Sequence, residues 1–295
     1  MAQYRVAGPD FIGIGMPKAG TGWLFDQLKY HPDFWIPPAK EISYLSRAKT
    51  RSKSAQKWLA RIERPGNEDR FQSWANRVEN DGRDLQFLRA LTGSIGQDMN
   101  LDFYASLFRF KGDALSGDMT AAYCALTPEI LSHLQERLPH TKIVLLVREP
   151  VGRAWSHLCM WHRRGDFDAG LLEDVNAFRD FLDGSGKFQN SSFPSQIITA
   201  WRQYAPKLPF KYFLFDDIVQ RPESVRRDIL TYLGADPDKA SGVLNAAYNK
   251  KSKRKKLQLA DSIKQVLVDY FADELRACGP VFGGAAQSWA PRYGL

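Results

Sequence analysis

Cysteine is scarce in this sequence of 295 residues, and long hydrophobic runs are absent. The three cysteines, Cys124, Cys159 and Cys278, are far apart, odd in number and without the short spacing of a metal site. We therefore expect reduced thiols in a cytoplasmic chain and no structural zinc. Residues 1–10 carry neither a basic head nor an apolar stretch long enough for a signal peptide or a membrane span. Secretion and membrane anchoring are therefore not expected.

Internal repeats and low-complexity tracts are lacking as well. With 44% hydrophobic residues the chain can bury a substantial core, and we expect one domain over residues 1–295. Basic residues outnumber acidic ones, 41 Lys and Arg against 33 Asp and Glu, for a formal net charge of +8. This excess favours anionic partners, although clustered cations also occur as a solvated surface.

A glycine-rich turn near the N-terminus carries the strongest functional signal. Residues 11–14 predict a buried strand, residues 15–20 a turn, and residues 21–30 a helix with one apolar face. Amides at a helix start, the positive end of the helix dipole and the Lys18 ammonium would converge on an anion. The stretch therefore predicts phosphate binding, with an ordinary strand–turn–helix as the alternative.

The order of residues in this turn departs from a Walker A loop, which places lysine directly after its last glycine and a magnesium-binding hydroxyl next. Here Lys18 comes first. Residues 17–24 instead resemble the 5′-phosphosulfate loop of sulfotransferases that use 3′-phosphoadenosine 5′-phosphosulfate (PAPS), especially the carbohydrate and bacterial branch. That branch has a His-Pro pair and then Lys-Glu-x-x-aromatic-aromatic. Residues 31–32 and 40–45 are similar, with Leu45 replacing the last aromatic residue.

A second motif follows an apolar strand predicted at residues 142–147. Arg148 comes directly after that strand, and Ser156 lies two turns into the helix expected next. Ligands of open α/β sheets bind at the carboxyl ends of the strands, where a guanidinium suits a phosphate. An arginine in a surface ion pair is the alternative. Residues 148–156 resemble the family segment Arg-[Asp/Glu]-Pro-x-x-Arg-Ala-x-Ser, which binds the 3′-phosphate.

Strand and helix patterns alternate along the chain, which predicts a central parallel sheet. We expect an α/β, P-loop-like, three-layer fold with this sheet flanked by helices. Residues 47–112 are charged and aromatic with helical spacing and predict a helical insertion, whose cations are either solvated or bind an acceptor. Further strands are predicted at 114–117 and 210–215, and helices at 127–138, 171–182, 195–204, 222–233 and 257–276.

The resemblance implies roles for particular residues. The donor nucleotide would be bound by Lys18, Ala19, Gly20, Thr21, Gly22, Trp23, Arg148 and Ser156. Lys18 would neutralise the leaving oxygens, and Glu41 would be the general base, with His157 as the second candidate. No metal is implied. In the segment 117–123, Met119 stands where the family often has a lysine, so the substrate contact of that lysine is in doubt.

Two charged stretches leave alternatives open. The basic run 249–256 resembles a family loop that covers the nucleotide, with Lys251, Ser252 and Arg254 as candidate contacts. A solvated tail and a nucleic-acid-binding segment are the two alternatives for this run. Asp216 and Asp217 fit a helix cap better than a metal site, because no complementary ligand spacing accompanies them.

These observations together predict a PAPS-dependent sulfotransferase, which transfers a sulfuryl group to a hydroxyl or amine of a carbohydrate or small-molecule acceptor and releases 3′-phosphoadenosine 5′-phosphate (PAP). A P-loop small-molecule kinase is one alternative, but it needs the Walker lysine and hydroxyl. A non-enzymatic protein that binds nucleotides or nucleic acids through the basic run is the other. The acceptor and the oligomeric state are not predicted.

Overall fold

The computed structural model describes residues 8–46, 60, 82–239 and 257–295. The predicted insertion at 47–112 therefore has a continuous described structure only from residue 82 onward, where it is helical. The basic run at 249–256, with Lys251, Ser252 and Arg254, lies outside the described residues.

A parallel sheet lies at the centre of the molecule, as the alternating pattern predicts. Its strands run in the order β2-β1-β3-β4. They are β1 (Phe11–Gly15), β2 (Gly117–Met119), β3 (Lys142–Val147) and β4 (Phe210–Leu214). Phe11 pairs with Gly117 on one side and with Lys142 on the other. Strand β1 is buried along its whole length, because helices cover both faces of the sheet.

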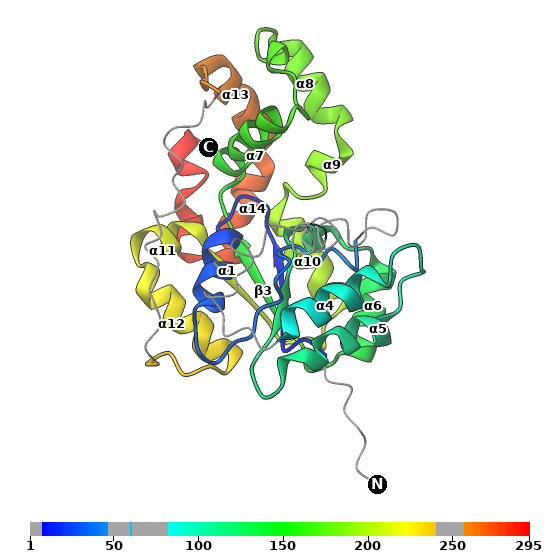
Figure 1. Ribbon diagram of the computed structural model, residues 1–295. Coiled ribbons are helices and arrows are strands. Elements are labelled where there is room, and N and C mark those ends of the chain that lie inside the picture. Colours follow the sequence, from blue (N-terminus) through cyan, green and yellow to red (C-terminus); the bar gives the residue numbers. More distant parts are fainter. Residues whose placement is uncertain (1–7, 47–59, 61–81, 240–256) are drawn as a thin grey trace.

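Helices flank this sheet on two sides (Figure 1). On one side lie α1 (Thr21–Lys29), α11 (Phe215–Gln220) and α12 (Pro222–Leu233). On the other side lie α4 (Arg83–Thr92), α5 (Leu101–Ser106), the 3-10 helix η2 (Leu107–Lys111) and α6 (Pro128–Arg137). Helix α10 (Pro194–Tyr204) packs against α6. This arrangement confirms the predicted α/β fold.

A further group of helices extends beyond the carboxyl edge of the sheet, in the upper part of Figure 1. It contains α7 (Pro150–Arg164), α8 (Val175–Gly184), α9 (Gly186–Gln189), α13 (Asp261–Tyr270) and α14 (Ala272–Phe282). Short 3-10 helices complete the described chain: η3 (Ala121–Ala125), η4 (Ala169–Leu172), η5 (Gly284–Ser288) and η6 (Pro291–Tyr293). None of the described helices is long and apolar enough to cross a membrane.

Several predicted boundaries are wrong for identifiable reasons. Strand β2 begins at Gly117 rather than at residue 114, because Leu115 pairs with Phe34 and exchanges backbone hydrogen bonds with residues 33–35. The helix predicted at 171–182 is split, since Asp174 accepts hydrogen bonds from the amides of residues 176 and 177 and starts α8.

Two more elements differ at aromatic residues. The strand predicted at 210–215 ends at Leu214, because Phe215 already belongs to α11. The helix predicted at 257–276 begins only at Asp261 and breaks at Phe271, a fully buried residue between α13 and α14. Helix α12, in contrast, has the predicted bounds and ends at Gly234, whose φ of 95° is left-handed.

Candidate active site

The turn between β1 and α1 presents backbone amides at the carboxyl edge of the sheet. The amide of Met16 donates to the Leu146 carbonyl at 2.8 Å, which ties the start of the turn to β3. Gly20 is the N-cap of α1 with a φ of 100°, and neither a side-chain cap nor an acidic residue occupies the first turn of α1. The first amides of a helix have no partner within it. This helix start is therefore suited to bind an anion, as its sequence predicts.

Lys18 and Arg148 bring two cations to this turn. Arg148 directly follows β3, and its Nη1 donates to the Lys18 carbonyl at 3.1 Å. The Arg148 guanidinium also lies over the Phe215 ring, 4.7 Å from its centroid. Within the described part of the chain, neither cation has a carboxylate at ion-pair distance. The structure thus brings together two residues that the sequence predicts at the carboxyl ends of strands.

The electrostatic environment of Lys18 is positive. Burial lowers the pKa of Lys18, and the nearby charges of Arg163, Arg148 and Arg164 lower it further. Burial likewise lowers the pKa of Arg148, while the more distant charges of Glu149 and Asp216 oppose that shift. An anion placed between these cations would relieve their mutual repulsion.

Helix α7 starts with a local structure that favours glycine at position 152. The Glu149 side chain caps the helix by accepting from the Gly152 amide at 2.6 Å. A Cβ atom at Gly152 would lie 2.1 Å from Glu149 Oε1 and 3.3 Å from Arg148 Nη2. Only glycine leaves room for both side chains here. Ser156 lies one turn further along α7 and is partly buried.

The other arginine of this motif, Arg153, points into the core instead. It is fully buried, and burial lowers its pKa to about 10. Its guanidinium lies 3.1 Å from His157 Nδ1, donates to Ser192 Oγ at 2.5 Å and faces the Phe188 ring. His157 also packs against Trp161, with ring centroids 4.6 Å apart. Arg153 and His157 therefore hold α7 against the segment around residue 190.

Glu41 lies on a segment that runs past the carboxyl end of β2. Its side chain is exposed, and its backbone is left-handed, with a φ of 62°. The ammonium of the neighbouring Lys40 lies 5.6 Å from the centroid of the Phe25 ring in α1. Burial lowers the pKa of Lys40, and the charges of Glu41 and Asp26 partly oppose this shift. Lys40 contacts Phe25 of α1, and the Ser43 amide donates to Thr120 Oγ1 after β2 at 3.1 Å, so the segment with Glu41 runs along the edge of the sheet that carries Lys18.

Asp118, a buried carboxylate in β2, lies near the Glu41 segment, and the sequence analysis does not single it out. It accepts hydrogen bonds from Thr120 Oγ1 at 2.7 Å, Tyr123 OH at 2.7 Å and Tyr104 OH at 3.1 Å. Burial raises the pKa of Asp118 to about 6, and the charge of Glu41 adds to the rise while the three hydroxyl donors oppose it. An acid within a short buried strand, with a threonine and a tyrosine two and five residues later, is the sequence signal that points to this cluster.

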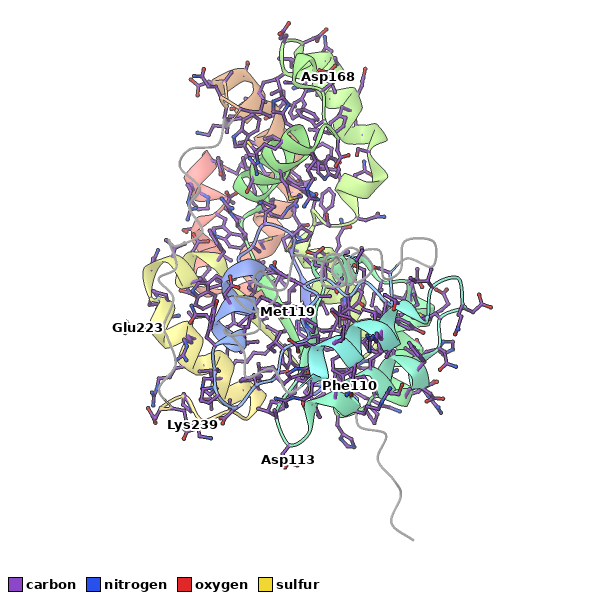
Figure 2. The ribbon with its side chains drawn as sticks, in the orientation of Figure 1. Phe110, Asp113, Met119, Asp168, Glu223 and Lys239 are labelled. Atoms are coloured by element: carbon purple, nitrogen blue, oxygen red, sulfur yellow. The ribbon has the colours of Figure 1, made fainter. Side chains whose placement is uncertain are left out.

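Met119, which replaces a family lysine, is a core residue. Figure 2 labels Met119 at the centre of the molecule, where the sheet meets the flanking helices. Its side chain is 3% exposed and lies over Gly13 of β1, where a Cβ atom would come within 2.2 Å of the Met119 sulfur. The methionine therefore fills the space above a glycine of the neighbouring strand.

The C-terminal residues also reach this edge of the sheet. Tyr293 OH donates to Glu149 Oε2 at 3.2 Å, and Arg292 forms an ion pair with Asp216 at 3.1 Å. Asp217 pairs with Arg221 at 3.2 Å, and both aspartates lie in the first turn of α11. The N-cap of α11 is Leu214 and no side chain caps this helix, so the predicted helix cap is wrong, and the two aspartates instead form ion pairs. Among the described residues no group of three or more His, Cys, Asp or Glu side chains is arranged to bind a metal.

A parallel sheet with a glycine-rich turn after β1 and an arginine after β3 defines an α/β protein with a P-loop-like fold. A sulfotransferase crystal structure from Alicyclobacillus acidocaldarius has a similar fold, with a TM-score of 0.60 at 19% identity, covering 96% of this chain and 99% of that chain. The sulfotransferase domain of the Synechococcus PCC 7002 olefin synthase aligns with a TM-score of 0.49 at 17% identity, covering 89% and 94% of the two chains.

Residues 9–239 match the Sulfotransferase family. Because that match spans most of the sequence, the chain belongs to the sulfotransferase family. A comparison with curated protein sequences gives no match. The family match includes the turn with Lys18, the Glu41 segment, β2 and the motif that starts at Arg148. It ends before α13, α14 and the C-terminal residues that contact Glu149.

Proposed function

We propose that this sulfotransferase uses PAPS as its donor and transfers the sulfuryl group to a hydroxyl or amine of a small-molecule or carbohydrate acceptor. The observation that carries the proposal is that Lys18 and Arg148 lie close together beside the amides that start α1. Among the described residues neither cation has a carboxylate partner. A donor with phosphate groups at both ends of its ribose supplies the anions that such a site lacks.

Donor binding is divided between two elements in this proposal. The amides of residues 19–23 and the Lys18 ammonium bind the 5′-phosphosulfate, and Arg148 and Ser156 bind the 3′-phosphate. Support comes from the position of Arg148, whose guanidinium is held by the Lys18 carbonyl and by the Phe215 ring. A planar guanidinium fixed in this way binds phosphate without losing much rotational freedom.

The reaction is an in-line displacement at sulfur. The acceptor oxygen or nitrogen forms a bond to sulfur while the bond from sulfur to the 5′-phosphate oxygen breaks, and PAP leaves with that electron pair. Lys18 stabilises the negative charge that develops on the leaving oxygen, which is the main contribution a protein makes to transfers of this kind. Glu41 accepts the proton from the acceptor.

Glu41 is preferred to His157 as the base because of what surrounds each residue. Arg153 can only donate, so Nδ1 of His157 is the acceptor of that bond and the ring carries its proton on Nε2. A histidine in this state has no free lone pair for a proton. His157 is also buried among aromatic rings, whereas Glu41 is exposed.

The donor is tested by thermal unfolding with four nucleotides. PAP and PAPS are expected to raise the melting temperature, because binding at 100 times the dissociation constant stabilises a protein by about 2.7 kcal/mol. ATP and adenosine 5′-phosphosulfate, which lack the 3′-phosphate, should raise it much less. Equal shifts for all four would contradict the assignment of Arg148 and Ser156. A screen of hydroxyl and amine acceptors with labelled PAPS, with and without magnesium, then tests transfer and separates it from kinase activity.

A further inference from the structure

Asp118 is a buried acid for which the proposed donor site gives no use. It lies in the middle of β2, opposite Ile12 of β1, and is fully buried. No ion pair joins it to a cation in the described part of the chain. A buried carboxylate is costly and persists where hydrogen bonds satisfy it. Three hydroxyl groups do so here, from Thr120, Tyr123 and Tyr104.

These hydrogen bonds have a fixed direction, because an ionised carboxylate only accepts. Thr120 and Tyr123 therefore give their hydroxyl protons to Asp118 and keep their oxygen lone pairs for other donors. Thr120 Oγ1 accepts from the Ser43 amide at 3.1 Å, and Tyr123 OH accepts from the Leu45 amide at 3.2 Å. Asp118 thus orients two hydroxyl groups that hold two amides of a segment about 75 residues earlier in the chain.

The segment held in this way is the one that carries Glu41. Tyr44, between the two tied amides, stacks on Phe103 and Tyr104 with ring centroids 5.7 and 5.5 Å away. Glu41 and Ser43 both have left-handed backbones, with φ values of 62° and 56°. Non-glycine residues adopt such positive φ angles only where the surrounding structure imposes them. The contacts at residues 43–45 are the restraint that fixes the backbone two residues after Glu41.

We propose that Asp118 is a positioning residue for sulfuryl transfer, which acts through Thr120 and Tyr123 to hold the Glu41 segment at the carboxyl edge of the sheet. This inference rests on the proposed function and deepens it. Ala121, the residue after Thr120, also adjoins the start of the turn between β1 and α1, since a Cβ atom at Gly15 would lie 2.7 Å from the Ala121 carbonyl oxygen. The short segment after β2 therefore contacts both the turn that would bind the donor and the segment that carries Glu41.

Thr120→Val is the variant that tests this role, because it keeps the size of the side chain and removes the hydroxyl that links Asp118 to the Ser43 amide. Release of labelled sulfate from PAPS, with water as the acceptor, is the rate assay. We expect the rate to fall by about 10- to 100-fold, the range for a small misplacement of a catalytic group. PAP affinity should stay within about twofold of wild type, and hydrogen exchange in residues 41–46 should become faster.

Two further substitutions separate positioning from a general structural role. Thr120→Ser keeps the hydroxyl and should restore most of the rate. Thr141→Val is the matched control, because Thr141 is also buried and donates to the Pro9 carbonyl at 2.9 Å, at the opposite edge of the sheet. It should lower stability to a similar degree and leave both the rate and the exchange of residues 41–46 unchanged.

Asp118→Asn tests the carboxylate itself. If this variant does not fold, Thr120→Val alone tests the positioning role. Faster exchange at residues 41–46 without a lower rate would overturn the positioning role. An equal loss of rate in Thr120→Val and Thr141→Val would also overturn it. A loss of rate in Thr120→Val with an equal loss of PAP affinity would overturn it as well. Failure of the proposed function has a different signature: wild type would not bind PAP, or Glu41→Gln would release sulfate as fast as wild type.

Discussion

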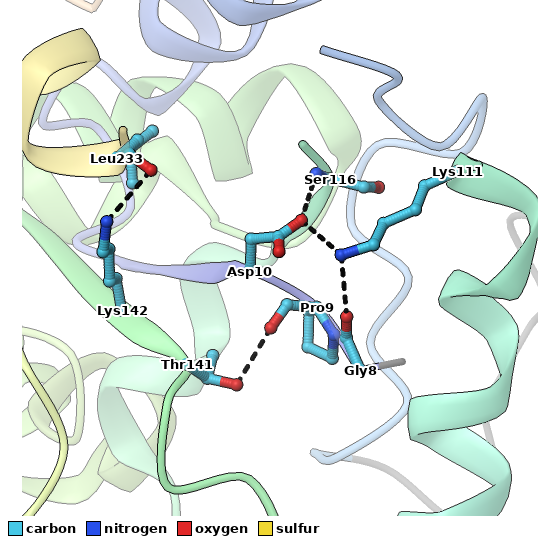
Figure 3. Close-up of polar contacts among 8 residues, drawn as sticks. All are labelled: Gly8, Pro9, Asp10, Lys111, Ser116, Thr141, Lys142 and Leu233. Atoms are coloured by element: carbon cyan, nitrogen blue, oxygen red, sulfur yellow. Dashed lines mark hydrogen bonds and ion pairs between the residues drawn. The ribbon is translucent and has the colours of Figure 1, made fainter. Parts of the chain in front are cut away.

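Polar residues at the two edges of the sheet have different partners. At the amino edge, Asp10 accepts from the Lys111 ammonium at 2.6 Å and from the Ser116 amide at 2.7 Å, and Lys142 donates to the Leu233 carbonyl at 3.1 Å (Figure 3). At the carboxyl edge, Lys18 and Arg148 have no carboxylate at ion-pair distance among the described residues. The described charges at the amino edge thus have protein partners, whereas Lys18 and Arg148 at the carboxyl edge lack a described carboxylate partner.

This difference indicates that the cations at the carboxyl edge contribute less to the free energy of unfolding than the paired charges at the amino edge. Neighbouring cations repel one another, and burial lowers the pKa of both Lys18 and Arg148 because the charged forms lose hydration. An ordinary structural site would place a carboxylate between them. Binding sites keep such unfavourable arrangements because an incoming ligand relieves them. Substitutions at the carboxyl edge should therefore change binding and rate, whereas those at the amino edge should change stability.

The largest effect is expected for Glu41→Gln, which keeps the shape of the side chain and removes its charge. If Glu41 is the base, turnover should fall by about 10²- to 10⁴-fold, the usual contribution of general acid–base catalysis. PAP affinity and melting temperature should stay near wild type, because the side chain is exposed and contributes no described ion pair. Steady-state kinetics with labelled PAPS and calorimetric titration with PAP measure the two quantities.

Glu136→Gln serves as the control for that change, because Glu136 is another exposed glutamate, on the surface of α6. A Glu41→Gln enzyme with nearly full turnover would mean that the proton leaves by another route, and His157→Ala would then be tested. Because His157 is buried against Trp161 and Arg153, we expect that second variant to lower stability in addition to any effect on rate. An amine acceptor attacks only after losing its own proton, so the comparison is made across a pH range.

The next largest effect is expected for Arg148→Ala. Removing one partner of a charged hydrogen bond costs about 1.5–3 kcal/mol, so PAP affinity should fall by roughly 10- to 150-fold. Arg148→Lys should recover only part of this loss, because an ammonium does not bind phosphate in a bidentate way. Arg276→Ala, at a surface ion pair with Asp273 in α14, is the control. Unchanged PAP affinity in Arg148→Ala would remove Arg148 from the donor site.

The proximity of Lys18 and Arg148 can be predicted from the sequence more easily than the Asp118 cluster, because each of the two cations directly follows a strand. Lys18 follows β1 directly and Arg148 follows β3 directly, so two strand ends are enough to bring them together. The Asp118 cluster instead joins Ser43 to Thr120 and Leu45 to Tyr123, across about 75 residues without local periodicity. Contacts of this kind depend on the packing of distant elements.

Local pattern also decides which fold elements are predicted correctly. Strand β3 has its predicted bounds, since its apolar run is short, continuous and followed by a helix start at Pro150. The sequence predicts the start of β2 three residues too early, because Leu115 is as apolar as a strand residue and its pairing with Phe34 leaves no local signal. It does not predict the break at Phe271, because a buried aromatic residue also fits the apolar face of a continuous helix.

The smallest effect is expected at the amino edge, where Asp10→Asn removes one charge of the pair with Lys111. Both side chains are partly exposed, at 30% and 14%, so the pair contributes less than a buried one. We expect the free energy of unfolding to fall by about 1 kcal/mol, a change that urea denaturation measures. PAP affinity and turnover should not change, because Asp10 precedes β1 and therefore lies at the opposite end of that strand from the Lys18 turn.

A double-mutant cycle with Lys111→Met isolates the pair from other contacts of Asp10, such as the Ser116 amide. If Asp10→Asn instead weakened PAP binding as strongly as Arg148→Ala, the two edges would be coupled through β1, and the separation of stability from function along this sheet would be wrong.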